Sequence, residues 1–148
     1  MTEKLTKDFD PLKLENQMCF PLYAAARKVT NLYTPFLAEL DLTYTQYIVM
    51  MVLWEKDGIS VKEIGERLYL DSGTLTPLMK NLEKKGLLVR NRSKEDERVT
   101  IAELTKEGRE LRNKALSIPE KIGSCIRLAP EEAIGLYQTL YKILDLLK

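Results

Sequence analysis

Apolar positions recur at mostly helical spacing through the first third of the chain, over residues 12–40. Asp10-Pro11 precedes them and suits a helix start, because Asp can cap free amides and Pro fits the first helical position. Pro21 and Pro35 each remove a backbone donor, so we expect a kink or a new helix start near each. Cys19 therefore lies either within two turns of a start at Pro11 or just before a start at Pro21.

Shorter apolar segments follow, separated by residues typical of turns. Thr43–Gln46 predicts a second helix start, and residues 47–54 (YIVMMVLW) predict a buried helix that ends at Asp57-Gly58. This longest apolar run is far short of the ~20 residues that a membrane span needs. The capping box at Ser60–Glu63 predicts a short helix through Leu68.

The middle of the chain predicts a helix-turn-helix followed by a β-hairpin, or wing. Asp71–Gly73 opens another helix, which stops at Gly86. Residues 87–92 and 98–104 are β-prone, and the polar residues 93–97 between them predict the turn of a hairpin. The helix that ends at Gly86 has one apolar face, and we expect the following side chains to meet the core: Leu75, Leu78, Met79 and Leu82.

Two further helices are predicted after the hairpin. A helix that begins at Thr105, with Glu107 in its first turn, is expected to run towards Leu128 with a kink at Pro119. Pro130 is expected to start a last helix, whose apolar side chains recur at helical spacing up to the C-terminus.

These elements predict a mainly α fold (α+β) in a single domain over residues 1–148, built on a winged helix-turn-helix over residues 43–105. Residues 11–42 and 106–148 provide long helices that are too apolar to be left bare. Packing against a second copy of the chain is the simplest way to bury them, so we expect these helices to form a two-fold homodimer.

Composition narrows the range of functions. The chain has 148 residues, of which 45% are hydrophobic and 30% are charged, and this excludes a disordered tail or a collagen-like repeat. It contains no histidine, which excludes histidine-based catalysis and metal sites that need imidazole. The charged segment MTEKLTKDFDP predicts no signal peptide, so we expect a cytoplasmic protein with no membrane partner. We also expect neither a metal nor a cofactor.

Charge is distributed unevenly along the chain. The net charge of +1 does not by itself suggest a nucleic-acid partner. Residues 80–94, however, carry a net charge of +5, whereas residues 1–70 carry a net charge of −2. A local basic patch on a nearly neutral protein is typical of a DNA-binding surface.

The helix over residues 72–85 has the features of a DNA-reading element. Small hydroxyl side chains near a helix N-terminus can reach base edges or phosphates, and basic side chains on the hairpin can reach the backbone or the minor groove. The alternative is that these are ordinary solvated side chains on an amphipathic helix and a hairpin. The candidate residues for binding double-stranded DNA are Ser72, Thr74, Thr76, Lys80, Arg90, Arg92, Lys94 and Arg98.

Two cysteines, Cys19 and Cys125, lie far apart in the sequence. In a reducing compartment they are expected to be free thiols, and two thiols without histidine make a poor zinc site. Cys19 has two alternative interpretations. A lone cysteine is often a small buried hydrophobe, but a position near a helix N-terminus favours the thiolate, and Tyr23, four residues on, can donate a hydrogen bond to it.

The segment LYLDSGTLTPLMKNLEKKGLLVRNRSKEDERVTIAELTKEG (residues 68–108) resembles the MarR family of winged-helix transcriptional regulators. Asp96-Glu97-Arg98 matches the D-x-R element of that family's wing, which adds Asp96 to the candidate DNA-binding residues. Residues 14–33 and 42–47 are similar to the organic hydroperoxide resistance repressors (OhrR) within the family. The resemblance covers residues 12–145 and implies no enzyme activity.

The resemblance implies a role for each thiol and for three tyrosines. In these repressors, a cysteine in the pattern L-x-x-Q-x-C-F, here Cys19, is oxidised by an organic hydroperoxide to a sulfenic acid. The implied thiolate network is Tyr23 on the same helix with Tyr33 and Tyr44, one or both from the partner subunit. Cys125 of the partner or a low-molecular-weight thiol would then resolve the sulfenic acid.

Together, these implications predict a homodimeric repressor that binds a pseudo-palindromic DNA operator and releases it when Cys19 is oxidised. Two other regulators remain open: one that responds to a small aromatic ligand in the tyrosine-rich cleft, and a broader thiol-based oxidation sensor. A thiol peroxidase is a further alternative, but no arrangement of arginine or threonine near Cys19 supports turnover, and it leaves the basic wing unexplained.

Overall fold

The computed structural model describes residues 9–148. Most of the charged N-terminal segment from which the absence of a signal peptide is predicted lies outside the described residues. Within the part of the chain that is described, no helix combines the length and the apolar character needed to cross a membrane. The chain divides into two compact units, of which the first ends at Leu116 and the second spans Ser117–Lys148.

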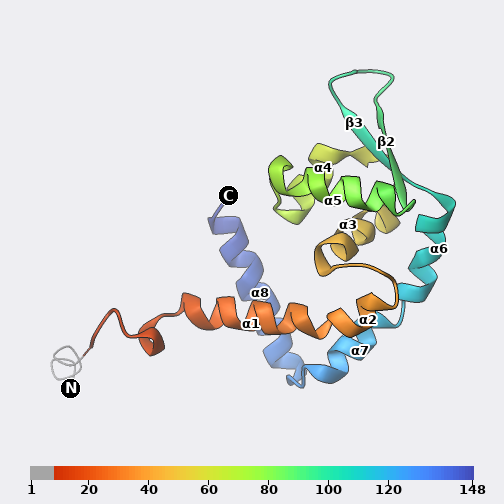
Figure 1. Cartoon of the computed structure of the whole chain (residues 1–148). Helices are drawn as coiled ribbons and strands as arrows, with labels where there is room; N and C mark the ends of the chain where they lie inside the picture. Colours follow the sequence, from red (N-terminus) through yellow and green to blue (C-terminus); the bar gives the residue numbers. More distant parts are fainter. Residues whose placement is uncertain (1–8) are drawn as a thin grey trace. The chain divides into compact units, whose positions relative to one another are not determined.

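The first unit is a helical bundle with a small sheet, and the β2–β3 hairpin extends beyond helices α4 and α5 (Figure 1). This arrangement confirms the predicted mainly α, winged helix-turn-helix fold. Its elements in chain order are η1 (Leu14–Asn16), α1 (Cys19–Leu32), α2 (Thr34–Ala38), α3 (Tyr44–Glu55), β1 (Ile59–Ser60), α4 (Val61–Leu68), α5 (Ser72–Lys84), β2 (Leu88–Arg92), β3 (Thr100–Leu104) and α6 (Lys106–Ala115).

The first long helix begins at Cys19, two residues before Pro21, so the helix start predicted near Pro21 is confirmed and the alternative start at Pro11 is wrong. Asp10 Oδ1 does accept a hydrogen bond from the Leu12 amide at 2.9 Å, but only a short turn follows. Pro21 is tolerated without a kink because it is the third residue of α1, where its missing N–H would have no partner within the helix. The new start predicted near Pro35 is confirmed, since Pro35 is the second residue of α2.

Side-chain caps set the starts of the three helices at the centre of the unit. Thr43 and Gln46 form a reciprocal capping box at α3, with bonds of 3.3 and 3.1 Å. Asp71 Oδ1 accepts from the Thr74 amide at 2.8 Å at the start of α5. Ser60 caps α4 as predicted, at 3.0 Å from the Glu63 amide, but the Glu63 carboxylate pairs with a lysine rather than closing a capping box.

The sheet has three antiparallel strands in the order β1-β3-β2. The hairpin of β2 and β3 is confirmed, with Leu88 opposite Leu104 and Arg92 opposite Thr100. The third strand, β1, is a difference from the prediction. Only two residues long, it pairs with the middle of β3 and is too short to show a period-two pattern in the sequence.

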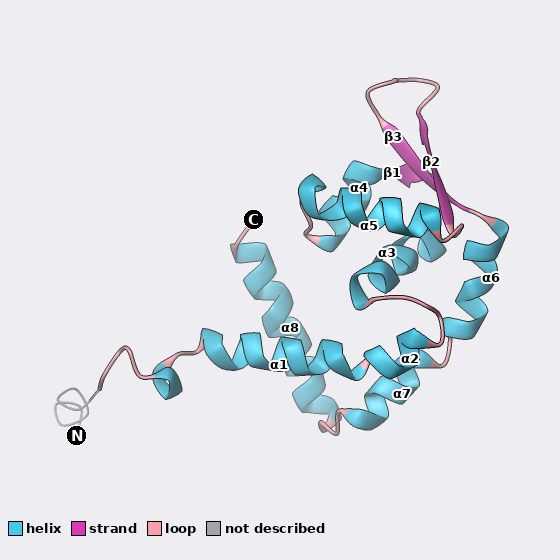
Figure 2. Cartoon of the chain, viewed as in Figure 1, coloured by secondary structure: helices cyan, strands magenta, loops and turns pink. Residues whose placement is uncertain are grey.

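Helices α3, α4 and α5 lie close together in the first unit (Figure 2). Its core is built around α3 and the inward faces of α4 and α5. Leu78, predicted to lie in the core, is only half-buried, whereas the other three apolar residues of its helix are buried. The most completely buried side chains of this unit are Leu37, Val49, Met50, Leu53, Ile64, Leu75, Met79, Leu82 and Leu88.

Helix α6 packs closely against the loop before β2. Thr105 Oγ1 accepts from the Gly108 amide at 3.1 Å, which confirms the predicted start, and it donates to the Gly86 carbonyl at 2.6 Å. The Trp54 indole donates to the Gly108 carbonyl at 2.8 Å. A Cβ at Gly108 would lie 2.0 Å from the Leu87 carbonyl oxygen, so this contact requires glycine.

The helix predicted from Thr105 towards Leu128 is instead two helices. Helix α6 ends at Ala115 and α7 (Ile118–Cys125) begins in the second unit. Pro119 is the second residue of α7, where proline is compatible with a helix start, so it accompanies a break rather than a kink.

The second unit contains α7 and α8 (Pro130–Leu146), whose start at Pro130 is as predicted. Ile118 and Ile122 of α7 are buried, but no residue of α8 is. Helix α1 of the first unit likewise buries none of its side chains. Both helices therefore expose apolar side chains.

We predict that Gly108→Ala destabilises the protein by about 3 kcal/mol, because the new methyl group must displace the Leu87 backbone. The melting temperature should fall by about 8 °C, measured by circular dichroism. Gly123→Ala is the control, since a Cβ there meets no atom within 4 Å. A Gly108→Ala variant that melts with the control would contradict the close contact.

Candidate functional site

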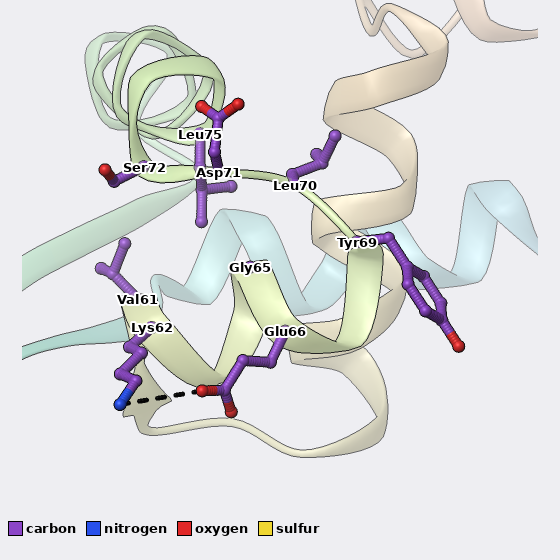
Figure 3. Close-up of a pocket in the computed structure, with 9 residues that line it drawn as sticks. All are labelled: Val61, Lys62, Gly65, Glu66, Tyr69, Leu70, Asp71, Ser72 and Leu75. Carbon is purple, nitrogen blue, oxygen red and sulfur yellow. Dashed lines mark ion pairs between the residues drawn. The ribbon is translucent and has the colours of Figure 1, made fainter. Parts of the chain in front are cut away.

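The corner between α4 and α5 presents the start of α5 to solvent (Figure 3). A hollow of about 520 Å³ lies in this corner, and its walls are mainly apolar. Gly65 permits the tight turn, since a Cβ there would lie 2.8 Å from the Leu70 carbonyl oxygen. Ser72 and Thr74 are exposed in the first turn of α5, and Thr76 is half-buried. The first-turn amides that Asp71 does not cap, together with these hydroxyls, form a surface suited to phosphates and base edges.

Lys80 of α5 is exposed and belongs to the same helix as these hydroxyls. Tyr69 is a residue of this corner that the sequence analysis did not single out. It ends α4 in the left-handed conformation, with φ of 55°, and is half exposed. Its ring points away from Asp71 and Ser72 (Figure 3). Nothing in the sequence pattern indicates it, because its exposure depends on that backbone conformation.

Arg90 has a different environment from the other basic residues of the wing. Its guanidinium donates to Glu83 Oε2 at 3.0 Å, and its amide donates to Glu83 Oε1 at the same distance. Arg90 Nε is buried without a hydrogen-bond partner. Arg90 thus ties the base of the wing to α5, and its hydrogen bond lowers the pKa of Glu83 below its usual value.

The wing tip carries the exposed basic groups. Asp96 Oδ1 accepts from the amide of Arg98 at 3.0 Å and from its Nε at 3.2 Å, so the D-x-R element orients an arginine that is 91% exposed. Lys94 is exposed beside them. Arg92 is also exposed and reaches Thr100 Oγ1 at 3.4 Å across the hairpin. The tip and the start of α5 are thus two solvent-facing surfaces, one basic and one rich in hydroxyls.

Cys19 is an exposed free thiol at the first position of α1. Tyr23 follows one turn later and is also exposed, with its ring 5.5 Å from the guanidinium carbon of Arg27. Cys125 is a free and exposed thiol at the end of α7. Within a single chain, Cys19 is therefore not a buried small hydrophobe.

Tyr33 and Tyr44 lie together at the other end of α1. Their rings meet edge to face with centroids 4.9 Å apart, and Tyr47 joins them with centroids at 5.9 and 6.4 Å. Burial raises the pKa of Tyr33, and Tyr44 raises it further. Burial also raises the pKa of Tyr44 and of Tyr47. These phenols stay protonated at neutral pH and can donate hydrogen bonds.

Cys19 is the first residue of α1, and Tyr33 directly follows the last residue of that helix. Fourteen residues of α-helix rise about 21 Å, so the thiol reaches neither Tyr33 nor Tyr44 of its own chain. The structure thus brings the two tyrosines together but separates them from the cysteine. Tyr47, missed by the sequence analysis, had one available signal: it is three residues after Tyr44 on the same helix.

Comparison with known proteins places this geometry in a family. Residues 31–115 match the family profile described as "Transcriptional regulator SarA/Rot". The chain is 47% identical over 139 residues to the organic hydroperoxide resistance transcriptional regulator of Bacillus subtilis, covering 94% of this chain and 95% of the relative. The chain belongs to this family of winged-helix regulators.

Other members of the family show the same likeness. The regulator TtmR of Methylorubrum extorquens is 46% identical over 136 residues, covering 92% of this chain and 70% of the relative. The structure of reduced AbfR of Staphylococcus epidermidis bound to DNA superposes with a TM-score of 0.75 at 34% identity, covering 91% of this chain and 94% of that one. The resemblance to the MarR family and to its hydroperoxide-responsive members is confirmed.

For this family member we predict that Glu83→Gln weakens the pH dependence of stability. Because Arg90 holds the pKa of Glu83 below its ordinary 4.5, the stabilising pair is fully formed above that value and is lost as the pH falls through the lower pKa of the folded state. Between about pH 5.5 and 3, the urea midpoint of the wild type should fall more steeply than that of the variant.

Glu97→Gln at the exposed wing tip is the matched control, because it removes the same charge without breaking the Arg90 contact. It should follow the wild-type curve. Parallel curves for wild type and Glu83→Gln would show that the pair contributes nothing to wing anchoring.

Proposed function

We propose that the protein is a dimeric repressor that binds DNA when reduced, senses organic hydroperoxides through Cys19 and then releases its operator. The observation that carries this proposal is the division of the thiol site: an exposed Cys19 at one end of α1 and a pair of protonated tyrosines at the other. Support also comes from the 47% identical relative named for organic hydroperoxide resistance, and from AbfR, solved in reduced, disulfide-bonded and overoxidised states.

The homodimer completes the site. Neither α1 nor α8 buries a side chain in the described chain. The apolar residues that they expose include Phe20, Leu22 and Ile134. A second copy covers these faces at a gain of about 25 cal/mol per Å² of apolar surface. It also brings Tyr33 and Tyr44 of one subunit to Cys19 of the other.

The chemistry follows from these groups. The Cys19 thiolate attacks one oxygen of the hydroperoxide, the O–O bond breaks, the sulfur becomes a sulfenic acid and the other oxygen leaves as an alkoxide that takes up a proton. The tyrosine hydroxyls donate hydrogen bonds to the thiolate and lose this acceptor on oxidation. The sulfenic acid then forms a disulfide with Cys125 of the partner or a low-molecular-weight thiol, releasing water.

The DNA is held at two places on each subunit. Helix α5 enters the major groove, with Ser72, Thr74 and Thr76 near base edges or phosphates and Lys80 on the backbone. Arg92, Lys94 and Arg98 on the wing contact the backbone or the minor groove. Arg90 and Asp96 act by positioning: the first anchors the wing and the second orients its arginine.

The protein acts as a regulator in the cytoplasm rather than as an enzyme, because its thiol is oxidised once per signal and must start reduced. The aromatic-ligand alternative has weaker support. PcaV of Streptomyces coelicolor, solved with its natural ligand, is only 22% identical to this chain, so it shares the fold and no more.

The test measures the affinity for the DNA upstream of the protein's own gene, by fluorescence anisotropy, before and after one equivalent of cumene hydroperoxide. Wild type should lose affinity by at least about tenfold, whereas Cys19→Ser should bind before and after alike. Tight binding by wild type that peroxide leaves unchanged would refute the redox function.

Cys125→Ser is the matched thiol control. If Cys125 resolves the sulfenic acid, this variant still reacts with peroxide but forms no intersubunit disulfide on a non-reducing gel. If a small thiol resolves it, release by the variant requires that thiol in the buffer.

Lys80→Ala tests the DNA interface. Each phosphate contact contributes about 0.9 to the slope of log K against log salt, and a dimer has two such lysines, so the slope should flatten by about two units on every sequence. Lys106→Ala removes the same charge from α6 and should leave the slope unchanged. An unchanged slope for Lys80→Ala would remove this lysine from the interface.

A further inference from the structure

We propose that Lys85 is a positioning residue that couples the Tyr33–Tyr44 pair to the C-terminal end of α5, and so transmits oxidation of the thiol site to the DNA-reading helix. This inference rests on the proposed function and goes beyond it by naming the connection within one subunit. In the sequence, Lys85 is one of several lysines in a basic window; only the fold distinguishes it.

Lys85 is the C-terminal capping residue of α5, and its side chain reaches the connection between α2 and α3. Its ammonium group donates to the backbone carbonyl of Asp41 and to Gln46 Oε1 at 3.3 Å, and it pairs with Asp41 Oδ2 at 3.3 Å. The side chain is only 28% exposed. One cation thus joins two oxygens of the loop between α2 and α3 and one oxygen in the first turn of α3, 39 to 44 residues away in the sequence.

Gln46 makes this contact more than a surface ion pair. It is 5% exposed, and among residues 9–148 it is the one polar side chain in the buried class. Its Oε1 accepts from the backbone amide of Thr43 at 3.1 Å as well as from Lys85, and the backbone amide of Gln46 donates to Thr43 Oγ1 at 3.3 Å. The capping box that starts α3 therefore shares its acceptor oxygen with the lysine.

The first residue of α3 after this cap is Tyr44. Asp41, the other partner of Lys85, has φ of 51°, and its amide donates to the Ala38 carbonyl at the end of α2. Tyr33 lies at the start of α2. The loop held by Lys85 thus sets how α2 and α3 meet, and with them the 4.9 Å separation of the two rings.

A displacement of either tyrosine strains this loop. Moving Tyr44 moves the cap of α3, which holds the oxygen that Lys85 contacts, and leaving Gln46 Oε1 short of a donor in a buried place costs free energy. The lysine is attached to the last turn of α5, so α5 shifts with the loop or loses the contact. The equilibrium between the two arrangements is the element that thiol oxidation and DNA binding both bias.

The experiment compares Lys85→Met with Lys84→Met, its exposed neighbour in the last turn of α5. For each, anisotropy gives the ratio of DNA dissociation constants after and before one equivalent of cumene hydroperoxide. Lys84→Met loses the same charge and should keep the wild-type ratio. Lys85→Met should bind DNA when reduced but show a ratio about tenfold smaller, within the usual range of coupling energies. An equal ratio in the two variants overturns the proposal.

A second readout needs no peroxide. Hydrogen exchange of the amides of residues 42–47 is followed by mass spectrometry with and without saturating DNA. In wild type and Lys84→Met, DNA should slow this exchange at least about threefold, because binding at α5 stabilises the loop. Lys85→Met should lose that slowing, and retained slowing counts against the proposal. If peroxide does not change DNA binding by the wild type, the proposed function fails. The hydrogen-exchange measurement then decides by itself whether Lys85 couples the loop to α5.

Asp41→Asn provides a variant that keeps the fold if Lys85→Met does not. Asparagine tolerates the left-handed conformation of this position, and the Asp41 side chain is exposed. The change removes the ion pair and keeps the carbonyl contact. It should reduce both the peroxide ratio and the DNA-induced slowing part of the way towards Lys85→Met, and wild-type values for both would overturn the proposal.

Discussion

The rigidity of α1 is the constraint on which the thiol site depends. A continuous helix from Cys19 to Leu32 fixes the thiol about 21 Å from the tyrosines that follow the helix, and no side-chain rotation spans that distance. A single chain with this geometry cannot assemble the proposed thiol site. In the proposed function, the apolar side chains that α1 exposes favour association with a second copy of the chain, and the tyrosines of that copy complete the site. The proposed thiol site and the association of two chains therefore both depend on helix α1.

A few polar contacts around α3 link the elements of the winged helix-turn-helix. The Thr43–Gln46 cap starts this helix, the Trp54 indole near its end donates to α6, and Arg90 ties the wing to α5 through Glu83. The contact of Trp54 joins residues 54 positions apart in the sequence, whereas the other two contacts are local. The wing, α5 and α6 are consequently linked to one helix whose first residue is a tyrosine of the proposed thiol site.

Local chemistry made much of this fold predictable. Asp71, Ser60 and Thr105 are strong capping residues directly before helical patterns, and each caps a helix in the structure. The first long helix starts near Pro21 rather than at Pro11, and the sequence left both starts open because tertiary context decides among competing local signals.

What could not be predicted depends on contacts between distant residues. Arg90 has the same composition signal as its basic neighbours, and only its contact with Glu83 separates it from them. The pairing of Tyr33 with Tyr44 and the reach of Lys85 to Asp41 likewise need the path of the loop between α2 and α3. The roles of Cys19 and of the tyrosines came from a family resemblance, and the helix geometry adds the physical reason for sharing the site between subunits.

Trp54 gives the molecule an optical property of its own. It is the sole tryptophan of the sequence, and its indole lies edge-on to Tyr47 while bonded to the carbonyl of Gly108. Its emission spectrum therefore comes from a single known place, the joint between α3 and α6. A shift in wavelength on oxidation or on DNA binding would report movement at that joint in the unlabelled protein, in real time and in solution.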